Sequence, residues 1–553
     1  MNNVSSMSSP SLGSGQDEMK NFRKTFEESY SPQTLVDLLR DRVAESADQV
    51  FGNWFEQGKT LTYRQLDDAS SRLASSLLRL GVRKQTHVAS MMSTCPEQPI
   101  LWFALAKIGA VLVPVNSSYT GAELANIVND SDAQFLVLSS EFMGVFKEAR
   151  DKLRVVTDNE LILNQEKQEG TKTLAEFIEN GSPEFVSPDP VFPSDLINIQ
   201  YTSGTTGFPK GCMLTHEFMT LFGTVAAGLR GAGGRVQTML IWAPFYYIDG
   251  QSMTITAIAL GATVFYPNRM SLTNFVGWLE KYEINLVTFP EPALKAYKMA
   301  GYNRDLKLVS VSAFNWGENL RKEFSENFEA NARDGYGMTE IGLTTFVPVS
   351  AREKAKQTTV GVPAAFRDVK IVDAQGAKVA RGEVGELWVH GRAKLLGYYK
   401  RPTANAESFE DGWFKTGDLF TEDEDGFYKI VGRKKDMIKR SGENISAREV
   451  EFVILDFEEI HQVAVLAVPD SKRKEEVKAY ILLREGYVKE DVTPERILAH
   501  CKKRLAGFKL PRYIAFVNSF PYTPTGKIKK TEILGDGQDP FAGSFDCVEW
   551  QWK

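Results

Sequence analysis

The run Tyr201-Thr202-Ser203-Gly204-Thr205-Thr206-Gly207-Phe208-Pro209-Lys210-Gly211 combines glycines, hydroxyl side chains and a lysine. It follows the stretch 195–200, which is typical of a strand, so backbone N–H groups at the strand end can converge on an anion. A Walker loop needs Gly, four residues and then Gly-Lys-Ser/Thr, whereas Gly204, Gly207 and Lys210 lie three apart. The run therefore predicts a phosphate-binding loop outside the P-loop class, with a flexible connector as the alternative.

The size and charge of the chain limit its possible functions. Its 553 residues exceed what one hydrophobic core supports, which predicts a large domain and at least one smaller one. The 65 basic and 71 acidic residues give no reason to expect a nucleic-acid partner. The longest apolar run, 100–115, includes Lys107 and is shorter than the roughly 20 residues that cross a bilayer. We expect a core helix that runs into a strand there, and no integral membrane association.

The cysteines and histidines show no metal-ligand spacing or catalytic triad. The cysteines are Cys95, Cys212, Cys501 and Cys547, and His87, His216, His390 and His461 are four of the five histidines. Well-separated cysteines are typical of a reducing compartment, so we expect buried thiols, structural histidines and a cytoplasmic protein. Residues 1–20 are rich in serine and lack an apolar signal-peptide core, which predicts a disordered tail.

Short β-rich runs alternate with helix-length amphipathic stretches between about 60 and 345. The expected strands are 88–92, 135–139, 239–244, 263–266, 285–289 and 308–313. This alternation indicates an α/β fold with largely parallel sheets. Period-two patterning at 369–372 and 386–389 predicts antiparallel strands, with a small barrel as one arrangement.

The composition changes again after Gly432. Strands at 463–468, 478–483 and 514–517 and a helix at 493–505 predict a separate α+β domain. We expect a tail over 1–20, a large domain over 21–434 and a small domain over 435–553.

Two further segments carry chemistry. Gly335-Tyr336-Gly337-Met338-Thr339-Glu340 offers an aromatic ring on which adenine can stack and a carboxylate that can hold Mg²⁺. Gly412-Trp413-Phe414-Lys415-Thr416-Gly417-Asp418 ends in a carboxylate that can accept from two ribose hydroxyls. A plain turn is the alternative for each segment. The cationic stretch 432–439 and the lysine after the Pro524–Gly526 turn are weak signals by themselves.

Together and in this order, from Thr34 to Lys530, these segments resemble the adenylate-forming superfamily. It includes acyl- and aryl-CoA ligases, the adenylation domains of peptide synthetases and beetle luciferases. Near Ile248-Asp249-Gly250-Gln251 the chain is most similar to ligases of the carnitine/crotonobetaine type. The resemblance implies a large α/β domain with parallel-rich sheets and a small β-barrel-like subdomain, and a mobile C-terminal α+β lid.

The resemblance also implies a nucleotide site. The residues implied to bind ATP are Thr202, Ser203, Gly204, Thr205, Thr206, Gly207, Lys210, Gly317, Glu318, Asn319, Tyr336, Asp418 and Arg433. The implied catalytic residues are Thr339 at the α-phosphate, Glu340 as the Mg²⁺ ligand and Lys527 on the lid. Lys435 corresponds to the hinge. A lysine and Mg²⁺ are suited to a reaction in which negative charge develops on phosphate oxygens, and Lys527 would act only when the lid closes.

The implied reaction has two steps: a carboxylic acid and ATP give acyl-AMP and pyrophosphate, and a thiol then displaces AMP. For the second step the resemblance implies that the lid presents the 439–444 segment, with Gly442 beside the pantetheine arm. Lys439, Arg473 and Lys474 are candidates for the phosphates of coenzyme A. The alternatives are transfer of an acid or amino acid to a carrier protein and a non-catalytic ATP-binding scaffold. The oligomeric state is left open.

The acid-binding residues depart from the family pattern. Tyr247 stands where many CoA ligases carry a histidine that gates the thiol tunnel, and Phe314-Asn315-Trp316 is bulkier than the usual segment. Tyr246, Tyr247, Phe314 and Trp316 are candidates for an aromatic box that takes a small aryl or betaine-like acid, and a long fatty chain would be harder to house there. Core packing is the alternative for the tyrosine pair.

Overall fold

The computed structural model describes residues 15–157, 160–166, 171–202, 209–314, 316–441, 443–522, 527–533 and 539–553. The described chain forms two compact units. The first takes up residues 15–202, 209–368 and 389–412, and the second takes up 369–388 and 413–553. Strands 413–434 therefore group with the C-terminal part, although we expected the boundary at 434. They do so because β22 contacts α15 and β24 of that part.

The first unit contains a seven-stranded sheet in the order β7-β6-β5-β3-β4-β8-β9. Its strands are β3 (His87–Met91), β4 (Val111–Pro114), β5 (Phe135–Ser139), β6 (Leu161–Asn164), β7 (Lys172–Thr173), β8 (Leu196–Thr202) and β9 (Lys210–Thr215). Neighbouring strands run parallel except β8 and β9, which are antiparallel. Strands β4 and β6 are buried along their whole length, and β5 nearly so, because helices cover both faces of the sheet.

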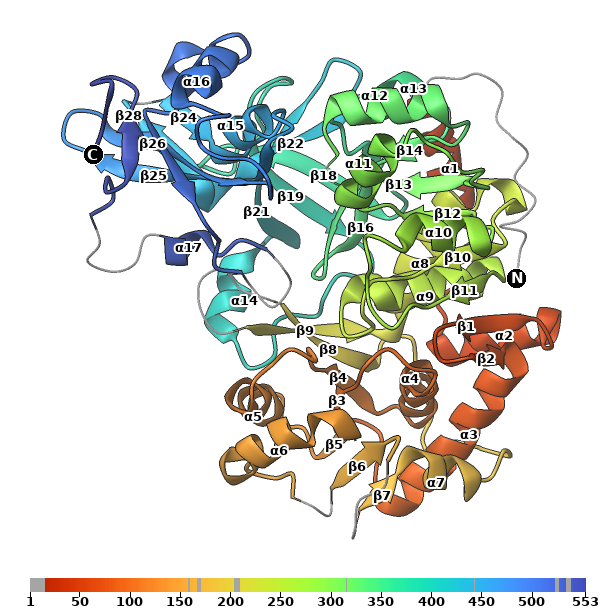
Figure 1. Ribbon diagram of the computed structural model, residues 1–553. Helices are drawn as coiled ribbons and strands as arrows, with labels where there is room; N and C mark the ends of the chain where they lie inside the picture. The colour runs from red at the N-terminus through yellow and green to blue at the C-terminus, as the bar shows by residue number, and fades with distance from the viewer. Residues whose placement is uncertain are drawn as a thin grey trace. The chain divides into compact units, whose positions relative to one another are not determined.

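Figure 1 shows α5 and α6 on one face of this sheet and α3, α4 and α7 on the other. The helices are α3 (Tyr63–Leu80), α4 (Glu97–Ile108), α5 (Gly121–Asp130), α6 (Met143–Ala149) and α7 (Leu174–Glu179). A capping box between Thr62 and Gln65 begins α3, and Gly81 ends it with a φ of 109°. Nearly every residue of α4 is buried, and the helix leads into β4, as expected for 100–115.

A second seven-stranded sheet of this unit has the order β14-β13-β12-β10-β11-β1-β2, and β15, β16 and β17 form a small antiparallel sheet. The strands are β1 (Val50–Trp54), β2 (Lys59–Thr62), β10 (Thr238–Leu240), β11 (Thr263–Phe265), β12 (Leu286–Thr288), β13 (Ser310–Ser312), β14 (Ala332–Arg333), β15 (Gly335–Met338), β16 (Gly342–Phe346) and β17 (Val362–Pro363). The helices in this part of the chain are α2 (Leu35–Ser46), α8 (His216–Arg230), α9 (Ile248–Leu260), α10 (Phe275–Lys281), α11 (Glu291–Met299), α12 (Glu318–Asn327), α13 (Arg352–Ala355) and, later, α14 (Pro402–Ser408). Pairing is parallel from β14 to β1, so the predicted α/β class with parallel-rich sheets is confirmed.

Helix α1 (Gly15–Ser29) differs from the expected tail over 1–20. Its apolar residues recur at helical spacing, so Met19, Phe22 and Phe26 share one buried face. Glu18 on the same helix accepts hydrogen bonds from the backbone N–H groups of Val349 and Ser350. The serine-rich composition hid this periodic pattern, and residues 1–14 lie outside the described part of the chain.

The second half of the chain adds two more sheets. One contains β18 (Arg367–Val372), β19 (Gly385–Gly391), β20 (Phe409–Glu410), β21 (Trp413–Glu422) and β22 (Tyr428–Arg433). The other contains β23 (Met437–Arg440), β24 (Glu443–Ser446), β25 (Ile460–Asp470), β26 (Lys474–Leu483), β27 (Tyr513–Val517), β28 (Ser544–Asp546) and β29 (Gln551–Trp552). Strands β18 and β19 are neighbours, in line with their period-two pattern.

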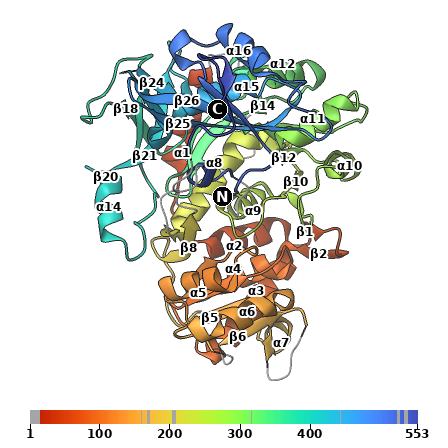
Figure 2. The same ribbon diagram turned by 60° about the vertical axis from the view of Figure 1, so that its left-hand side comes forward.

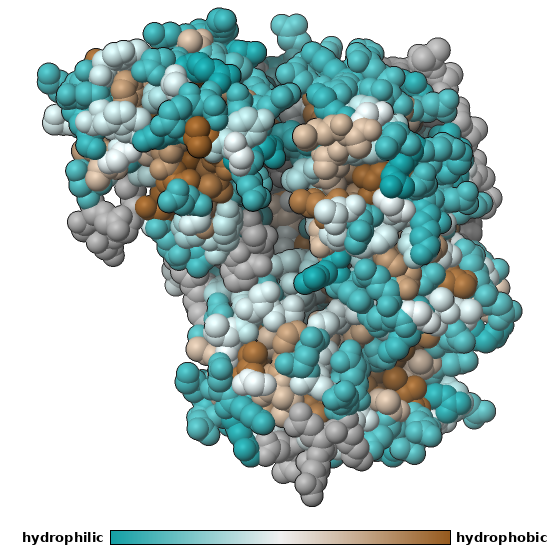
Figure 3. Space-filling model, in the orientation of Figure 1, coloured by the Kyte–Doolittle hydropathy of each residue, from teal (hydrophilic) through white to brown (hydrophobic). Residues whose placement is uncertain are grey.

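Helices cover one face of the C-terminal sheet. Helices α15 (Ala447–Ile454) and α16 (Pro494–Lys502) bury Val450, Ile454 and Ile497 against it (Figures 1 and 2). The other face carries a smaller apolar cluster that includes Tyr480 and Phe520, close to α17 (Lys530–Ile533). Figure 3 shows apolar side chains on the surface of this unit.

The expected thiols are free, with Cys95, Cys212 and Cys501 buried and Cys547 half-buried. In the described ranges, no helix has both the length and the apolar character that spanning a bilayer requires.

Candidate active site

The two strands that flank the glycine-rich run form a closed hairpin. Thr202, the last residue of β8, is paired with Lys210, the first residue of β9, and its hydroxyl donates to the Lys210 carbonyl at 3.4 Å. Strand β8 also pairs with β4 inside the sheet. The loop that joins the hairpin therefore starts and ends at fixed positions. Its predicted phosphate-binding residues Ser203, Gly204, Thr205, Thr206 and Gly207 lie outside the described residues.

Glu340 and Lys210 are brought together by a tyrosine that sequence reasoning missed. Glu340 lies between β15 and β16, is 7% exposed, and its Oε1 accepts from the Tyr398 hydroxyl at 3.0 Å. The Lys210 ammonium lies 4.0 Å from the centre of the Tyr398 ring. Burial, and next the charge of Glu340, raises the pKa of the Tyr398 hydroxyl, which therefore stays a proton donor. Tyr398 thus orients a carboxylate and contacts the lysine at the end of the loop.

Backbone pairing explains the position of Tyr398. The amide N–H of Leu396 donates to the Met213 carbonyl, and the amide N–H of Tyr399 donates to the Gly211 carbonyl, so this segment lies along β9. The Glu340 carbonyl accepts from Leu395 at 2.9 Å. No sequence spacing links position 398 to positions 210 and 340, so only the pattern Gly397-Tyr398-Tyr399 was available as a signal.

Tyr336 and Thr339 lie near Glu340 in the chain but differ in exposure. Tyr336, in β15, is 7% exposed, and its hydroxyl donates to the Met338 sulfur at 3.1 Å. Thr339 is half-buried. The ring of Tyr336 is therefore mostly packed against protein in this structure.

A buried arginine holds the two predicted adenine segments together. Arg321 donates to the carbonyls of Ala313 and Trp316 and forms an ion pair with Asp334 at 2.6 Å. Asp334 directly precedes β15, and its other oxygen accepts from the Gly335 N–H. Arg321 thus fixes both the approach to Gly317, Glu318 and Asn319 at the start of α12 and the start of the Tyr336 segment.

Asp418 and Arg433 are brought into contact in the second unit. They are paired residues of the antiparallel strands β21 and β22, and Arg433 Nε lies 3.1 Å from Asp418 Oδ1. The Asp418 side chain is 9% exposed and that of Arg433 is 42% exposed, so the pair has one buried and one open member. Glu386 stabilises the residues next to this pair, because its carboxylate accepts hydrogen bonds from the Gly417 N–H and from the Lys434 ammonium.

Lys435 and Lys527, predicted as hinge and catalytic lysine, also lie in this unit. Lys435 belongs to a short 3₁₀ turn, η4 (Lys434–Asp436), where burial and next the charge of Arg433 lower its pKa. Lys527 is exposed and begins the described segment 527–533. That segment is anchored by Lys530, which forms an ion pair with Glu451 at 2.6 Å.

Both tyrosines of the predicted gate are held by hydrogen bonds from neighbouring side chains. The rings of Tyr246 and Tyr247 are 4.6 Å apart and edge-to-face. Asn116 donates to the Tyr247 hydroxyl at 3.0 Å, and Gln200 of β8 donates to the Tyr246 carbonyl at 2.7 Å. Tyr246 also lines a cavity of about 10 Å³, which has room for at most one water. That cavity is too small to hold an acid.

Trp316 differs from its expected place in an aromatic box. It is 1% exposed, packs against Phe289 and Phe324, and donates its indole N–H to the Phe289 carbonyl at 3.0 Å. Trp316 is therefore part of the core in this structure. Phe314 is half-buried.

The residues predicted to meet coenzyme A cluster at two hairpins of the C-terminal sheet. Arg440 follows Lys439 in β23 and lies opposite Lys474 in the antiparallel backbone pairing of β23 with β26. The amide N–H of Ser441 donates to the Arg473 carbonyl at 2.9 Å. The amide N–H of Lys439 is held by Glu475. Gly442 lies outside the described residues.

Glu340 fits the role of a Mg²⁺ ligand. Mg²⁺ is commonly held by one or two carboxylates together with phosphate oxygens of a nucleotide, and the buried Glu340 supplies one oriented carboxylate. In the part of the chain that the structure describes, no group of three or more His, Cys, Asp or Glu side chains is arranged for a metal.

Comparisons with known proteins agree on one family. The model for AMP-binding enzymes matches residues 39–399, and that for the AMP-binding enzyme C-terminal domain matches 449–527. The crotonobetaine/carnitine–CoA ligase of Proteus mirabilis is 32% identical over 89% of this chain and 97% of its own length. The long-chain-fatty-acid–CoA ligase of Yersinia pestis is 29% identical over 90% and 94%. The anthranilate CoA ligase AuaEII in complex with anthranoyl-AMP superposes with a TM-score of 0.82 at 24% identity, covering 92% of this chain and 98% of that one.

Proposed function

Because the chain belongs to the family of AMP-binding enzymes, we propose that it is an ATP-dependent ligase that joins a carboxylic acid to coenzyme A. The observation that carries this proposal is the cluster of Lys210, Tyr398 and Glu340 at the ends of the glycine-rich hairpin. It offers a cation and an oriented carboxylate beside a loop suited to phosphates. The alignment of ligases over nearly the whole chain supports the same reading.

In the first step, a carboxylate oxygen of the acid attacks the α-phosphorus of ATP. The bond from that phosphorus to the bridging oxygen breaks, and pyrophosphate leaves with the electron pair. Lys210 and the loop hold the leaving phosphates, Thr339 and Lys527 donate to the α-phosphate and the acid, and Asp418 and Arg433 hold the ribose. Mg²⁺, when bound at Glu340, neutralises phosphate charge.

In the second step, the thiol sulfur of coenzyme A attacks the acyl carbon, the bond to the AMP oxygen breaks, and the thiol proton passes to solvent. The basic groups around Lys439, Arg473 and Lys474 support a role in binding the phosphates of coenzyme A, since cations from two hairpins meet there. Lys435 is the proposed hinge between the two steps.

We propose a small aryl or betaine-like acid as the substrate. The edge-to-face tyrosine pair offers aromatic surface to a ring or a quaternary ammonium, and we expect the bulky Phe314 to leave less room for an alkyl chain. Trp316 is left out of this surface because it is buried. The relative from Proteus mirabilis, named for crotonobetaine and carnitine, supports this class, whereas the Yersinia pestis relative, named for long-chain fatty acids, is the competing case.

The test is turnover of an acid panel by the purified chain with ATP, Mg²⁺ and coenzyme A. We expect AMP and pyrophosphate, with an acyl-CoA detected by mass spectrometry for aryl or betaine acids. Formation of ADP, or turnover of long fatty acids alone, would contradict the reaction or the acid class respectively. With hydroxylamine present and coenzyme A omitted, the acyl-AMP is trapped as a hydroxamate. Trapping without any use of coenzyme A would favour a carrier protein as acceptor.

The free thiols support a cytoplasmic location.

A further inference from the structure

The last residues of the chain extend the C-terminal sheet. Strand β28 pairs antiparallel with β27, and β29 pairs with β28. Phe545 of β28 packs against Trp550 and Trp552. The match to the C-terminal family model ends at residue 527, so these strands lie beyond it. The tail therefore adds ordered structure whose role the family match leaves open.

The tail carries a carboxylate that is fully covered by protein. Asp546 is 0% exposed, and its Oδ1 accepts from the backbone N–H groups of Val548 and Glu549 at 2.9 and 3.1 Å. Its Oδ2 lies 3.3 Å from Arg512 Nη2 and 3.8 Å from Lys553 Nζ. A buried charge persists only when it is paired and hydrogen-bonded, so the tail and Arg512 depend on each other.

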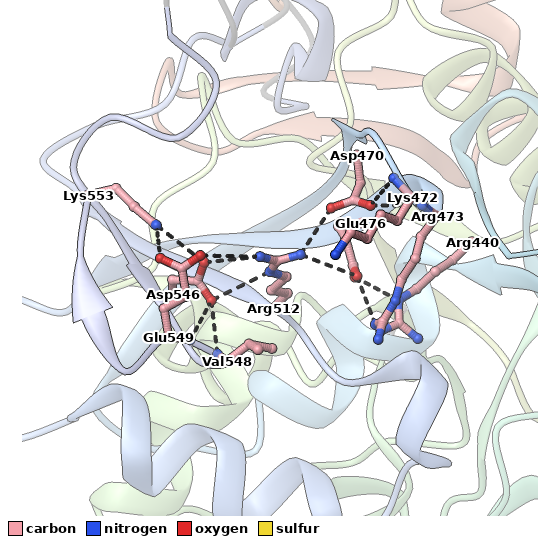
Figure 4. Close-up of polar contacts among 10 residues, drawn as sticks. All are labelled: Arg440, Asp470, Lys472, Arg473, Glu476, Arg512, Asp546, Val548, Glu549 and Lys553. Atoms are coloured by element: carbon pink, nitrogen blue, oxygen red, sulfur yellow. Dashed lines mark hydrogen bonds and ion pairs between the residues drawn. The ribbon is translucent and has the colours of Figure 1, made fainter.

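Arg512 continues the network into the sheet. Its Nη1 lies 3.0 Å from Asp470 Oδ2 and 3.9 Å from Glu476 Oε1. Figure 4 shows Arg512 between Asp546 on one side and Asp470 and Glu476 on the other. One guanidinium thus spans the tail and the hairpin between β25 and β26.

Glu476 connects this network of ion pairs to β23. Its side chain is 0% exposed and accepts from Arg440 at 2.6 Å and from Arg473 at 2.9 Å. Arg440 ends β23, and the next residue, Ser441, has a φ of 52° and donates its N–H to the Arg473 carbonyl. A non-glycine residue with positive φ is strained, and the surrounding contacts must hold it in place.

We propose that the tail positions β23 for thioester formation through the sequence of ion pairs from Asp546 to Arg512, Glu476 and Arg440. This inference rests on the proposed function, in which the segment from Lys439 onward faces coenzyme A. Without the charge of Asp546, Arg512 moves toward Asp470 and Glu476 and competes with Arg440 for Glu476. Arg440 and the strained Ser441 then lose their fixed positions, and the thiol is held less well against the acyl carbon. Asp546 is a positioning residue and does not touch the reactants.

The test is Asp546→Asn in the full-length chain, with Asp539→Asn as the control. Asp539 lies in the same tail, is exposed and accepts from the N–H of Phe541, so both variants lose one carboxylate. The two half-reactions are measured apart, as ATP–pyrophosphate exchange and as acyl-CoA formation from the acyl-AMP of the panel acid that the wild type converts fastest. We expect Asp546→Asn to lower kcat of the thioester step about tenfold, as displacement of a positioning segment does. Pyrophosphate exchange and the KM for ATP stay at wild-type values, and Asp539→Asn changes neither step.

Two outcomes overturn the inference: an unchanged thioester step in Asp546→Asn, or an equal fall of both steps. The second marks a general loss of structure, because Lys527 lies in the same unit. If Asp546→Asn does not fold, the same two half-reactions are measured for Arg512→Lys, and the same outcomes support or overturn the inference. A lysine keeps the positive charge but cannot contact Asp546 and Glu476 at once. A wild type that forms no thioester from any acyl-AMP contradicts the proposed function instead.

Discussion

The hydroxyl of Tyr398 donates to Oε1 of Glu340 at 3.0 Å, across 58 positions of sequence. The same tyrosine ring lies under the ammonium of Lys210. A neutral donor on the buried carboxylate fixes its orientation without cancelling its charge. A carboxylate held in this way is ready to bind a cation that a nucleotide brings with it.

Tyr398→Phe tests this relationship. We expect the rate of ATP–pyrophosphate exchange to fall about tenfold, because a lost hydrogen bond to a charged group costs roughly 1.5 kcal/mol or more. The Mg²⁺ concentration for half-maximal exchange rises, since the carboxylate is no longer oriented. The second readout is Mg²⁺-dependent binding of ATP by calorimetry.

Tyr399→Phe is the control for Tyr398→Phe. The Tyr399 hydroxyl donates to Asp132, which is exposed, and not to Glu340. Exchange by this variant stays at the wild-type rate. Equal losses in both variants would assign the effect to the packing of the whole segment.

Asp418→Asn tests the pair formed with Arg433. The buried Asp418 carboxylate contacts the partly exposed Arg433, and its proposed role is to accept hydrogen bonds from the ribose hydroxyls. We expect the KM for ATP to rise about tenfold through the loss of the proposed charge-assisted hydrogen bonds to ribose. The preference for ATP over 2′-deoxy-ATP becomes smaller.

Arg381→Gln is the control on the same sheet, because Arg381 forms an exposed ion pair with Glu422. Its removal leaves the KM for ATP unchanged. A KM in Asp418→Asn equal to that of the wild type would contradict the ribose role.

Lys527→Ala separates the two steps of the proposed reaction. We expect it to abolish pyrophosphate exchange, because its cation is assigned to the charge that develops during attack on the α-phosphate. Thioester formation from supplied acyl-AMP is spared, since that step needs no charge on departing pyrophosphate. Lys529→Ala is the control, because Lys529 pairs with Glu532 on the surface. Loss of both steps in Lys527→Ala would contradict the assignment.

The sequence predicted the strands best where an apolar run is bounded by polar residues. β5 has the expected bounds, Phe135–Ser139, and β12 and β13 lie inside the expected runs. β10 ends at Leu240 although the apolar run continues to Pro244; the N–H of Ile241 still donates to the Phe265 carbonyl of β11, and the chain then turns away toward Tyr246. Periodicity reports burial, and a buried residue need not be hydrogen-bonded in a sheet.

The site was predictable only where its residues are local in sequence. Glu340 and Asp418 could be named from their glycine-bounded segments, which by themselves predict turns with exposed acids. Tyr398 and Arg321 could not, because their roles come from contacts with chain segments that lie far away or carry no motif. Trp316 shows the opposite error, since an aromatic residue beside a predicted site is still most often part of the core.

The buried His216 predicts how the stability of the first unit depends on pH. His216 is 0% exposed, and its Nδ1 accepts from the Leu35 N–H at 3.3 Å, which only the neutral ring can do. Burial lowers its pKa from 6.5 to about 4, with Asp195 and Asp37 opposing the shift and Lys84 adding to it. The unfolded chain therefore binds more protons than the folded chain between pH 6.5 and pH 4, so stability falls as the pH falls through this window.

We expect the wild type to lose about 2 kcal/mol of unfolding free energy between pH 8 and pH 5 through this one histidine. His216→Gln can keep the bond to Leu35 through its amide oxygen but does not titrate, so its loss over the same range is smaller by that amount. His390→Gln is the control, because His390 lies on the surface of the same unit. The measurement is the urea midpoint of the first unit, followed by tryptophan fluorescence, at pH 8 and pH 5. A pH dependence in His216→Gln as steep as in the wild type would show that other groups cause it, because only the wild type carries an imidazole at this buried position.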